Sequence, residues 1–236
     1  IGPQLGENRR ESVVFSLAIL VYALLSFDIY CNCILTDQEL GLLISRVNHA
    51  FLVFLPSLIL HLVLLVTKTP GTRWMIVPAY SLSALFALST HSDLYLSGSF
   101  RYFWGFHARV GILFNVMSFL STIYLTYCLL LMWRSYRETT DKNIKRRYIF
   151  LLIGTSATAL LTFGNIPAML GHEIYPSGNF IFIPVILLTM GIFKYNLEEL
   201  KRLGGKILYY GVLFSGIAVA AMHLPGLMNQ IPQPLN

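Results

Sequence analysis

The sequence is dominated by long apolar blocks, and its charged residues lie almost entirely in the gaps between them. A helix needs roughly 20 mostly apolar residues to cross the hydrocarbon layer of a bilayer, which is about 30 Å thick. Several of the blocks reach that length. Hydrophobic residues make up 56% of the 236 residues and charged residues 12%, whereas a soluble domain carries about 25% charged residues. We therefore expect an integral membrane protein.

Seven blocks can be placed along the chain. They cover residues 12–35, 42–66, 74–92, 108–133, 148–170, 176–195 and 206–228. Each block is expected to be helical, because only helices and closed barrels satisfy their backbone polar groups in lipid, and strand-like alternation is not evident. The predicted fold is an all-α membrane protein, a bundle of about seven transmembrane helices.

The blocks also suggest how the chain is divided. We expect a cytoplasmic flank over residues 1–11, a six-helix membrane bundle over 12–200, an additional transmembrane helix over 201–228 and a polar tail over 229–236. Because the first residue is Ile1, we expect the chain to be a processed or excised part of a longer polypeptide.

The distribution of Lys and Arg predicts the orientation. If the seven blocks alternate strictly, all of the 17 Lys and Arg residues except Arg46, Arg101 and Arg109 fall on one side. The richest gap lies between blocks four and five, from Arg134 to Arg147. Because positive charge accumulates on the cytoplasmic side, the N-terminus is predicted to be cytoplasmic and the C-terminus to lie outside.

Several polar residues fall inside the blocks, mostly toward the predicted outer side. They are Asp28, Arg46, His49, Arg109, Asn115 and Asn165. An ionisable residue in a spanning segment is costly and is a functional hypothesis by default. One interpretation is an outward-opening cavity that binds a small polar or amphipathic ligand. The alternative is that Asp28 pairs with Arg46 or Arg109 and only fixes helix packing.

The gap from Ser92 to His107 is dense in aromatic residues, with Gly98 and Gly105 as helix breakers. Tyr102 and Trp104 in this gap are candidate ligand contacts. The whole segment is also the part of the chain that we predict to form a gate over the cavity. The alternative is an interfacial belt without a ligand role, because Tyr and Trp concentrate at membrane surfaces.

Other functional classes find no support in the sequence. It contains no nucleophile elbow, Gly-rich phosphate loop or paired metal motif, so we predict no enzyme activity, no metal and no cofactor. A haem held by His49 or His61 would need facing partners at equal depth, which the sequence does not indicate. The basic residues are spread over short loops, so we expect no nucleic-acid partner.

Four stretches carry a resemblance to a known family. They are RVNHAFLVFLPSLILHLVLLVTK from Arg46, FRYFWGFHARVGILF from Phe100, KRRYIFLLIG from Lys145 and GNIPAMLGHEIYPSGNFIFIPVILLTMGIFKYNLEEL from Gly164. From Arg46 to Leu200 the pattern resembles the N-terminal multi-helix membrane region of bacterial sensor histidine kinases. The family pattern usually has one more helix at its start, and it lacks the block from Lys206 to Met228. No catalytic residue is implied for this region.

This resemblance favours a sensory input module in the bacterial inner membrane, crossing it several times. A small or lipid-like ligand would act on the outer cavity, and Glu198, Glu199, Lys201 and Arg202 would pass the signal to the cytoplasmic side. The expected partners are the lipid bilayer and that ligand, and a homodimer is left open. The alternatives are a structural or accessory subunit of a larger membrane complex and, last, a small-molecule transporter, for which no internal repeat is seen.

Overall fold

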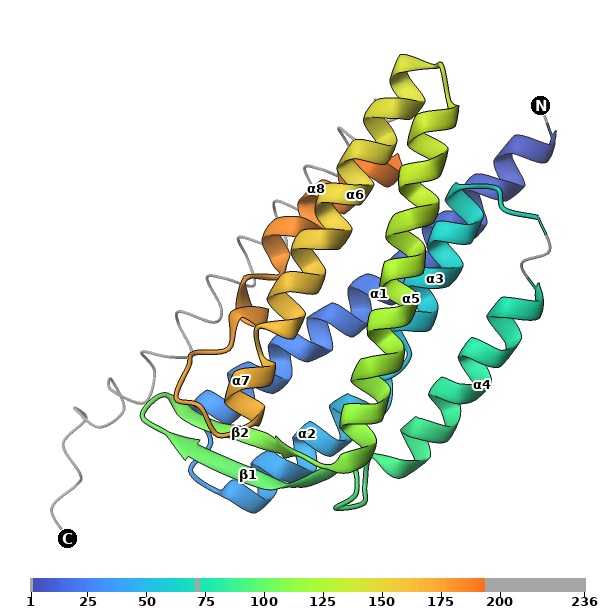
Figure 1. Ribbon diagram of the computed structural model, residues 1–236. Helices are drawn as coiled ribbons and strands as arrows, with labels where there is room; N and C mark the ends of the chain where they lie inside the picture. The colour runs from blue at the N-terminus through green and yellow to red at the C-terminus, as the bar shows by residue number, and fades with distance from the viewer. Residues whose placement is uncertain (1, 71–72, 194–236) are drawn as a thin grey trace, which may run out of the picture. The chain divides into compact units, whose positions relative to one another are not determined.

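The computed structural model describes residues 2–70 and 73–193, and these form one mostly helical unit (Figure 1). The helices are α1 (Gly2–Ile34), α2 (Gln38–Leu52), α3 (Leu55–Val66), α4 (Arg73–Ser89), α5 (Ile112–Glu138), α6 (Lys142–Phe163), α7 (Ile166–Met169) and α8 (Phe182–Phe193), with a 3-10 turn η1 (Ser177–Phe180) before α8. Strands β1 (Leu96–Tyr102) and β2 (Gly105–Val110) form one antiparallel hairpin.

Four segments of the described chain are long and apolar enough to cross a membrane. They are Arg10–Ile34, Gln38–Val66, Ile112–Glu138 and Lys142–Met169. Two shorter apolar helices, Trp74–Ser89 and Phe182–Ile192, lie in the third and sixth predicted blocks. The mostly helical membrane character is therefore supported. The seventh block, 206–228, and the divisions at 201–228 and 229–236 lie outside the described residues.

The prediction that the chain is all-α is wrong between blocks three and four, where the hairpin lies. Block four was expected to begin as a helix at residue 108, but the strand continues to Val110 and α5 begins at Ile112. Gly105 follows a two-residue turn and has a φ of +137°, a conformation that a residue with a side chain rarely adopts. An added Cβ at Gly105 would also collide with the α1 backbone at Asn32 and Cys33.

The basic gap between blocks four and five is shorter than predicted, because both flanking helices extend into it. Only residues 139–141 separate α5 from α6. Asp141 caps α6, and its carboxylate accepts hydrogen bonds from the backbone amides of Asn143 at 2.7 Å and Ile144 at 3.4 Å. The apolar blocks end where charge begins, whereas α5 continues to Glu138 and α6 begins directly after its N-cap Asp141.

The second predicted block is interrupted at Val53–Phe54 and continues as α3, which has Pro56 in its first turn. Proline lacks a backbone N–H and cannot continue a preceding helix without loss of a hydrogen bond. The hydroxyl of Ser83 on α4 donates to the Val53 carbonyl at 2.9 Å. Ser83 also bonds Ser57 at 2.8 Å, so α4 satisfies the backbone at this break.

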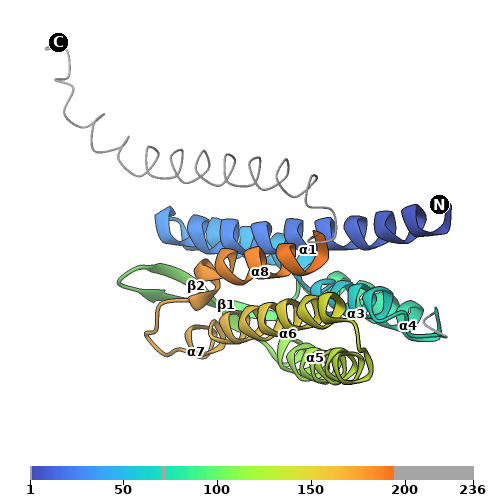
Figure 2. The same ribbon diagram turned by 90° about the horizontal axis from the view of Figure 1, so that it is seen from above.

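The helices alternate between two ends of the described unit (Figure 1). One end carries the start of α1 and the α5–α6 turn, and the opposite end carries the α1–α2 turn and the hairpin. We call these the basic end and the hairpin end. Seen from above, α1 and α8 lie on the side of the unit opposite α5 (Figure 2). Helix α5 exposes apolar side chains such as Val116, Phe119 and Leu130, as a lipid-facing helix does.

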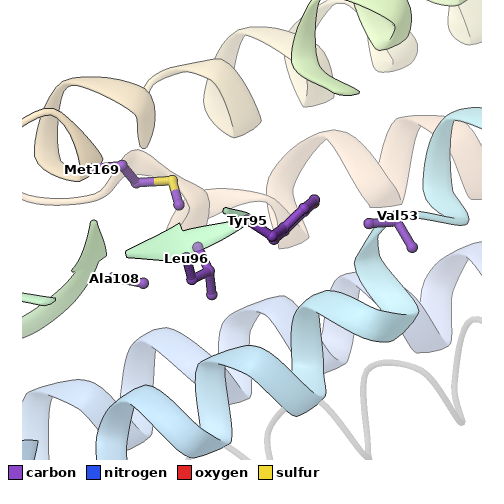
Figure 3. Packing of buried hydrophobic residues seen from close by; sticks show 5 residues of the cluster. All are labelled: Val53, Tyr95, Leu96, Ala108 and Met169. Atoms are coloured by element: carbon purple, nitrogen blue, oxygen red, sulfur yellow. The ribbon is translucent and has the colours of Figure 1, made fainter. Parts of the chain in front are cut away.

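A small core joins the hairpin to the helices at the hairpin end (Figure 3). It consists of Val53 at the α2–α3 break, Tyr95 and Leu96 at the start of β1, Ala108 of β2 and Met169 of α7. Tyr95 and Leu96 are 2% and 0% exposed. The hairpin is therefore packed into the bundle rather than suspended above it.

Candidate binding cavity and polar cluster

A cavity of about 130 Å³ lies among the helices, toward the hairpin end. Its walls come from α1, α2, α3, α5, α6 and α7, together with Tyr95 before β1. The α5 residues run from Phe114 to Leu125, in the first half of that helix, and the α6 residues from Thr155 to Phe163, in its second half. Both sets lie in the half of their helix nearer the hairpin.

The lining of the cavity is mostly apolar and contains no Lys, Arg, His, Asp or Glu. Its polar groups are hydroxyls and the amide of Asn165, whose Oδ1 accepts a hydrogen bond from the Gly178 amide at 2.8 Å. The volume is close to that of an engineered apolar cavity of roughly 150 Å³ that accepts benzene. An apolar wall with a few polar groups is typical of small-molecule sites.

A buried polar cluster centred on Asp28 lies beside this cavity. Asp28 is 2% exposed, and its Oδ1 accepts hydrogen bonds from Ser45 Oγ at 2.8 Å, Asn32 Nδ2 at 3.4 Å and Asn48 Nδ2 at 3.4 Å. Asn32 also donates to Ser45 Oγ at 2.9 Å. The His49 Nδ1–H donates to the Ser45 carbonyl at 2.8 Å. The cluster thus ties α1 to α2 through neutral donors.

His49 is the member of the cluster nearest to the cavity wall. Its ring centroid lies 6.1 Å from those of Tyr95 and Phe114, and both of these rings line the cavity. Asp28 and His49 do not themselves line it. The polar cluster and the cavity are therefore neighbours separated by one layer of aromatic side chains.

Arg46 has a different partner from the one that we considered. Its Nη2 binds the Asp93 carboxylate at 2.5 Å and the Leu96 carbonyl at 2.8 Å, and thereby fixes the start of the hairpin to α2. The alternative that Asp28 pairs with Arg46 or Arg109 is therefore replaced by the neutral hydrogen bonds above. Arg109 is exposed, and its guanidinium lies 5.6 Å from the centroid of the Phe100 ring.

The two predicted aromatic contacts stack on each other at the hairpin turn. The ring centroids of Tyr102 and Trp104 are 4.9 Å apart, and the Tyr102 hydroxyl donates to the Ala168 carbonyl at 2.5 Å. Trp104 also approaches Tyr175, with ring centroids 5.7 Å apart. These contacts connect the hairpin to the segment between α6 and α8.

His107 on β2 is buried, and neither ring nitrogen has a hydrogen-bond partner among the described residues. Burial, with a smaller contribution from the charge of His49, lowers the pKa of His107 to about 4. His107 is therefore neutral near pH 7. Burial also raises the pKa of Tyr95 above its usual range, so its hydroxyl keeps its proton.

The structure brings together only some of the predicted ligand contacts. Asp28 and His49 meet in the cluster, Asn165 lines the cavity, and Arg46, Tyr102 and Trp104 hold the hairpin. Arg109 and Asn115 are exposed and reach neither the cluster nor the cavity. The predicted transmission residues Glu198, Glu199, Lys201 and Arg202 lie beyond the part of the chain that the structure describes.

Sequence reasoning missed most of the cavity wall, including Tyr22, Tyr95 and Ser121. An apolar or hydroxyl side chain on a helix gives the same pattern whether it packs in a core or faces a cavity. The run from Gly154 to Asn165 is rich in small and hydroxyl residues, a composition that also suits close helix packing in lipid. Part of it, Thr155, Ala159 and Thr162, lines the cavity.

A buried ion pair lies near the basic end. Arg147 Nη2 binds Glu11 Oε2 at 2.6 Å, and Arg147 Nε donates to the Gly191 carbonyl at 3.0 Å. The two side chains are 18% and 8% exposed. Arg147 thus connects the start of α6 to α1 and to the end of α8, which is the last described helix.

The model of one protein family, the N-terminal 7TM region of histidine kinase, matches residues 5–201 of the chain. The match begins in the first turn of α1, covers all the later described helices and ends eight residues after α8. No curated protein and no solved structure is significantly similar to the chain.

Proposed function

The chain belongs to the family of N-terminal 7TM regions of histidine kinases, and from this membership we propose that it senses an apolar or lipid-like molecule in the cavity between its helices. Such a region is a membrane-embedded input region of a signalling protein. The proposed signal passes from the cavity to the basic end of the bundle, in a bacterial inner membrane that the chain crosses several times.

The observation that carries the proposal is the cavity itself. It lies between α3, α5 and α6, so an occupant would contact three spanning segments at once. A ligand shifts an equilibrium between two helix arrangements only through its different affinity for them. A cavity at a junction of helices gives that difference, because a change in helix spacing changes every contact with the occupant.

The route to the other end of the bundle is also present in the described residues. Helix α6 lines the cavity with Thr155 and Ala159, and two to three turns earlier it holds Arg147, which binds both Glu11 and the end of α8. A displacement of α6 at the cavity would therefore act on α8, the helix that leads toward the proposed transmission residues.

Occupancy of the cavity can be tested by photolabelling. We expect octanol carrying a diazirine ring, an azioctanol, to label Met117 or Ser121 when the purified chain is reconstituted in lipid nanodiscs. Ala159→Phe adds about a ring to the cavity wall and should reduce this labelling several-fold, as measured by peptide mass spectrometry. Leu160→Phe is the matched control, since Leu160 is 73% exposed on the outside of α6. Equal labelling of both variants would contradict binding in the cavity.

The proposed orientation places the basic end in the cytoplasm. Thr140 is exposed in the α5–α6 turn, so a Thr140→Cys variant should be protected from an impermeant maleimide added to intact cells. An exposed site in the hairpin turn, Phe103→Cys, should be labelled under the same conditions, because Phe103 is 83% exposed. Labelling of Thr140→Cys but not of Phe103→Cys would invert the orientation.

A further inference from the structure

We infer that the cavity takes an uncharged molecule with an apolar body and one hydrogen-bond acceptor, such as a carbonyl oxygen, to which one or two of the hydroxyls of Tyr22, Tyr95 and Thr155 donate. This inference names the class of ligand and rests on the proposed function in requiring that the cavity be occupied.

The three side chains are buried, and their hydroxyls lack partners. Tyr22, Tyr95 and Thr155 are 6%, 2% and 5% exposed, and none of their hydroxyls has a hydrogen-bond partner among the described residues. They come from α1, from the segment before β1 and from α6, and all three side chains line the same cavity. A polar group that loses water without gaining a partner costs about 1–3 kcal/mol, so a molecule that fills the cavity should bind better when it offers these hydroxyls an acceptor.

Two other hydroxyls in the same wall are satisfied within their own helix, and a third, that of Ser118, belongs to a side chain that is only partly buried. Ser121 donates to the Met117 carbonyl at 2.7 Å, and Thr162 donates to the Thr158 carbonyl at 2.9 Å. The fully enclosed polar atoms without partners in the described residues belong to Arg46, Ser99, Trp104 and His107, none of which lines the cavity. The three free hydroxyls are therefore open to the cavity space.

The chemistry of the wall excludes a charged occupant. No Lys, Arg or His lines the cavity to neutralise a carboxylate or phosphate, and no Asp or Glu lines it to neutralise an amine. A charge without a counter-ion in such surroundings is very costly. A hydroxyl can donate to a neutral acceptor without that cost, and the volume of about 130 Å³ accommodates a single ring or a short alkyl chain.

Competition against the azioctanol label separates these ligand classes. In nanodiscs containing the purified chain, 2-octanone, octane and octanoate would be compared at equal mole fractions in the lipid. The ketone should halve labelling at a mole fraction about 3- to 10-fold lower than octane does, the difference expected for one net neutral hydrogen bond. Octanoate should be the weakest competitor.

The hydroxyl variants then test the assignment of the residues. Tyr22→Phe and Tyr95→Phe each remove one oxygen and keep the ring, so each should lower the preference for ketone over octane, and the double variant should bring the ratio close to one. Tyr148→Phe is the control, because Tyr148 is also buried but its hydroxyl already donates to the Val66 carbonyl at 3.5 Å. This variant should keep the wild-type ratio.

The outcomes distinguish the two proposals. If azioctanol labels the cavity but octane competes as well as the ketone, the inferred ligand class is wrong and the proposed function stands. Stronger competition by octanoate would overturn the inference in favour of an anion. Absence of labelling in the cavity would overturn the proposed function, and the inference with it.

Discussion

Replacing Arg147 with alanine should lower the free energy of unfolding by about 3–5 kcal/mol, the range expected when one partner of a buried ion pair is removed. The variant leaves the Glu11 carboxylate, whose side chain is 8% exposed, without its partner at 2.6 Å. It also removes the donor to the Gly191 carbonyl. Reversible unfolding of the purified chain in mixed detergent micelles measures the loss.

Two further variants show whether the pair is the cause. Arg146→Ala removes the neighbouring, exposed arginine and should change stability little. Replacing both partners, Glu11→Leu with Arg147→Met, should recover much of the loss, because no unpaired charge remains buried. A loss below about 1 kcal/mol for Arg147→Ala, the usual limit for an exposed pair, would contradict a tie between α1, α6 and α8.

Asp28→Ala should also destabilise the protein strongly, by on the order of 3 kcal/mol, because it leaves the donors of Ser45, Asn32 and Asn48 without their shared acceptor. Asp28→Asn keeps one acceptor oxygen and should cost less than half as much. The same unfolding measurement applies to both. Glu39→Ala is the exposed control, since Glu39 is an exposed acidic residue in the first turn of α2.

The stability of the Asp28 variants, compared with their azioctanol labelling, shows whether Asp28 holds the helices together or contacts the ligand. A large loss of stability with unchanged azioctanol labelling would make the cluster a structural tie between α1 and α2. Unchanged stability with altered labelling would contradict that role and return Asp28 to the set of ligand contacts.

The helices could be predicted from the sequence because a segment in lipid must satisfy its own backbone hydrogen bonds, which a helix does. A block such as 42–66 is mostly apolar and long enough to span a bilayer, and its interruption is marked by Pro56. The end of α5 and the start of α6 were harder to predict, because α6 begins at its N-cap Asp141 and α5 continues to Glu138, both beyond the apolar runs. The family resemblance was also visible in the sequence, and the family match over residues 5–201 confirms it.

The hairpin was not predicted because its burial has no period of two. Phe106, His107 and Ala108 are three consecutive buried residues on β2, packed between helices on more than one side. A half-buried strand would have alternated. Only Gly105, with its positive φ after two turn residues, marks the turn, and a single glycine in an aromatic segment predicts little by itself.

The candidate site depended on contacts between distant parts of the chain. Arg46 pairs with Asp93, which lies 47 residues later in the sequence. Its partner could therefore not be predicted from the residues on the same helix face. Asp28 and His49 were predicted as ligand contacts in one cavity; they meet in the polar cluster instead, and neither lines the cavity. The cavity itself lies where the apolar surfaces of several helices are not in contact, and no residue type or spacing in the sequence predicts such a gap.

A molecule bound in the cavity should change the arrangement of α1 and α5 at the basic end. Two spin labels report that arrangement in nanodiscs, one at Arg10→Cys on α1 and one at Thr140→Cys beyond α5, with the three native cysteines replaced by alanine. The distance between the labels is measured by pulsed electron–electron double resonance. With azioctanol photoattached in the cavity, the mean distance between labels should shift by about 1–2 Å, the scale of helix shifts in switching proteins. Ala159→Phe should remove the response to azioctanol and Leu160→Phe should keep it. An unchanged distance distribution in fully labelled protein would contradict the claim.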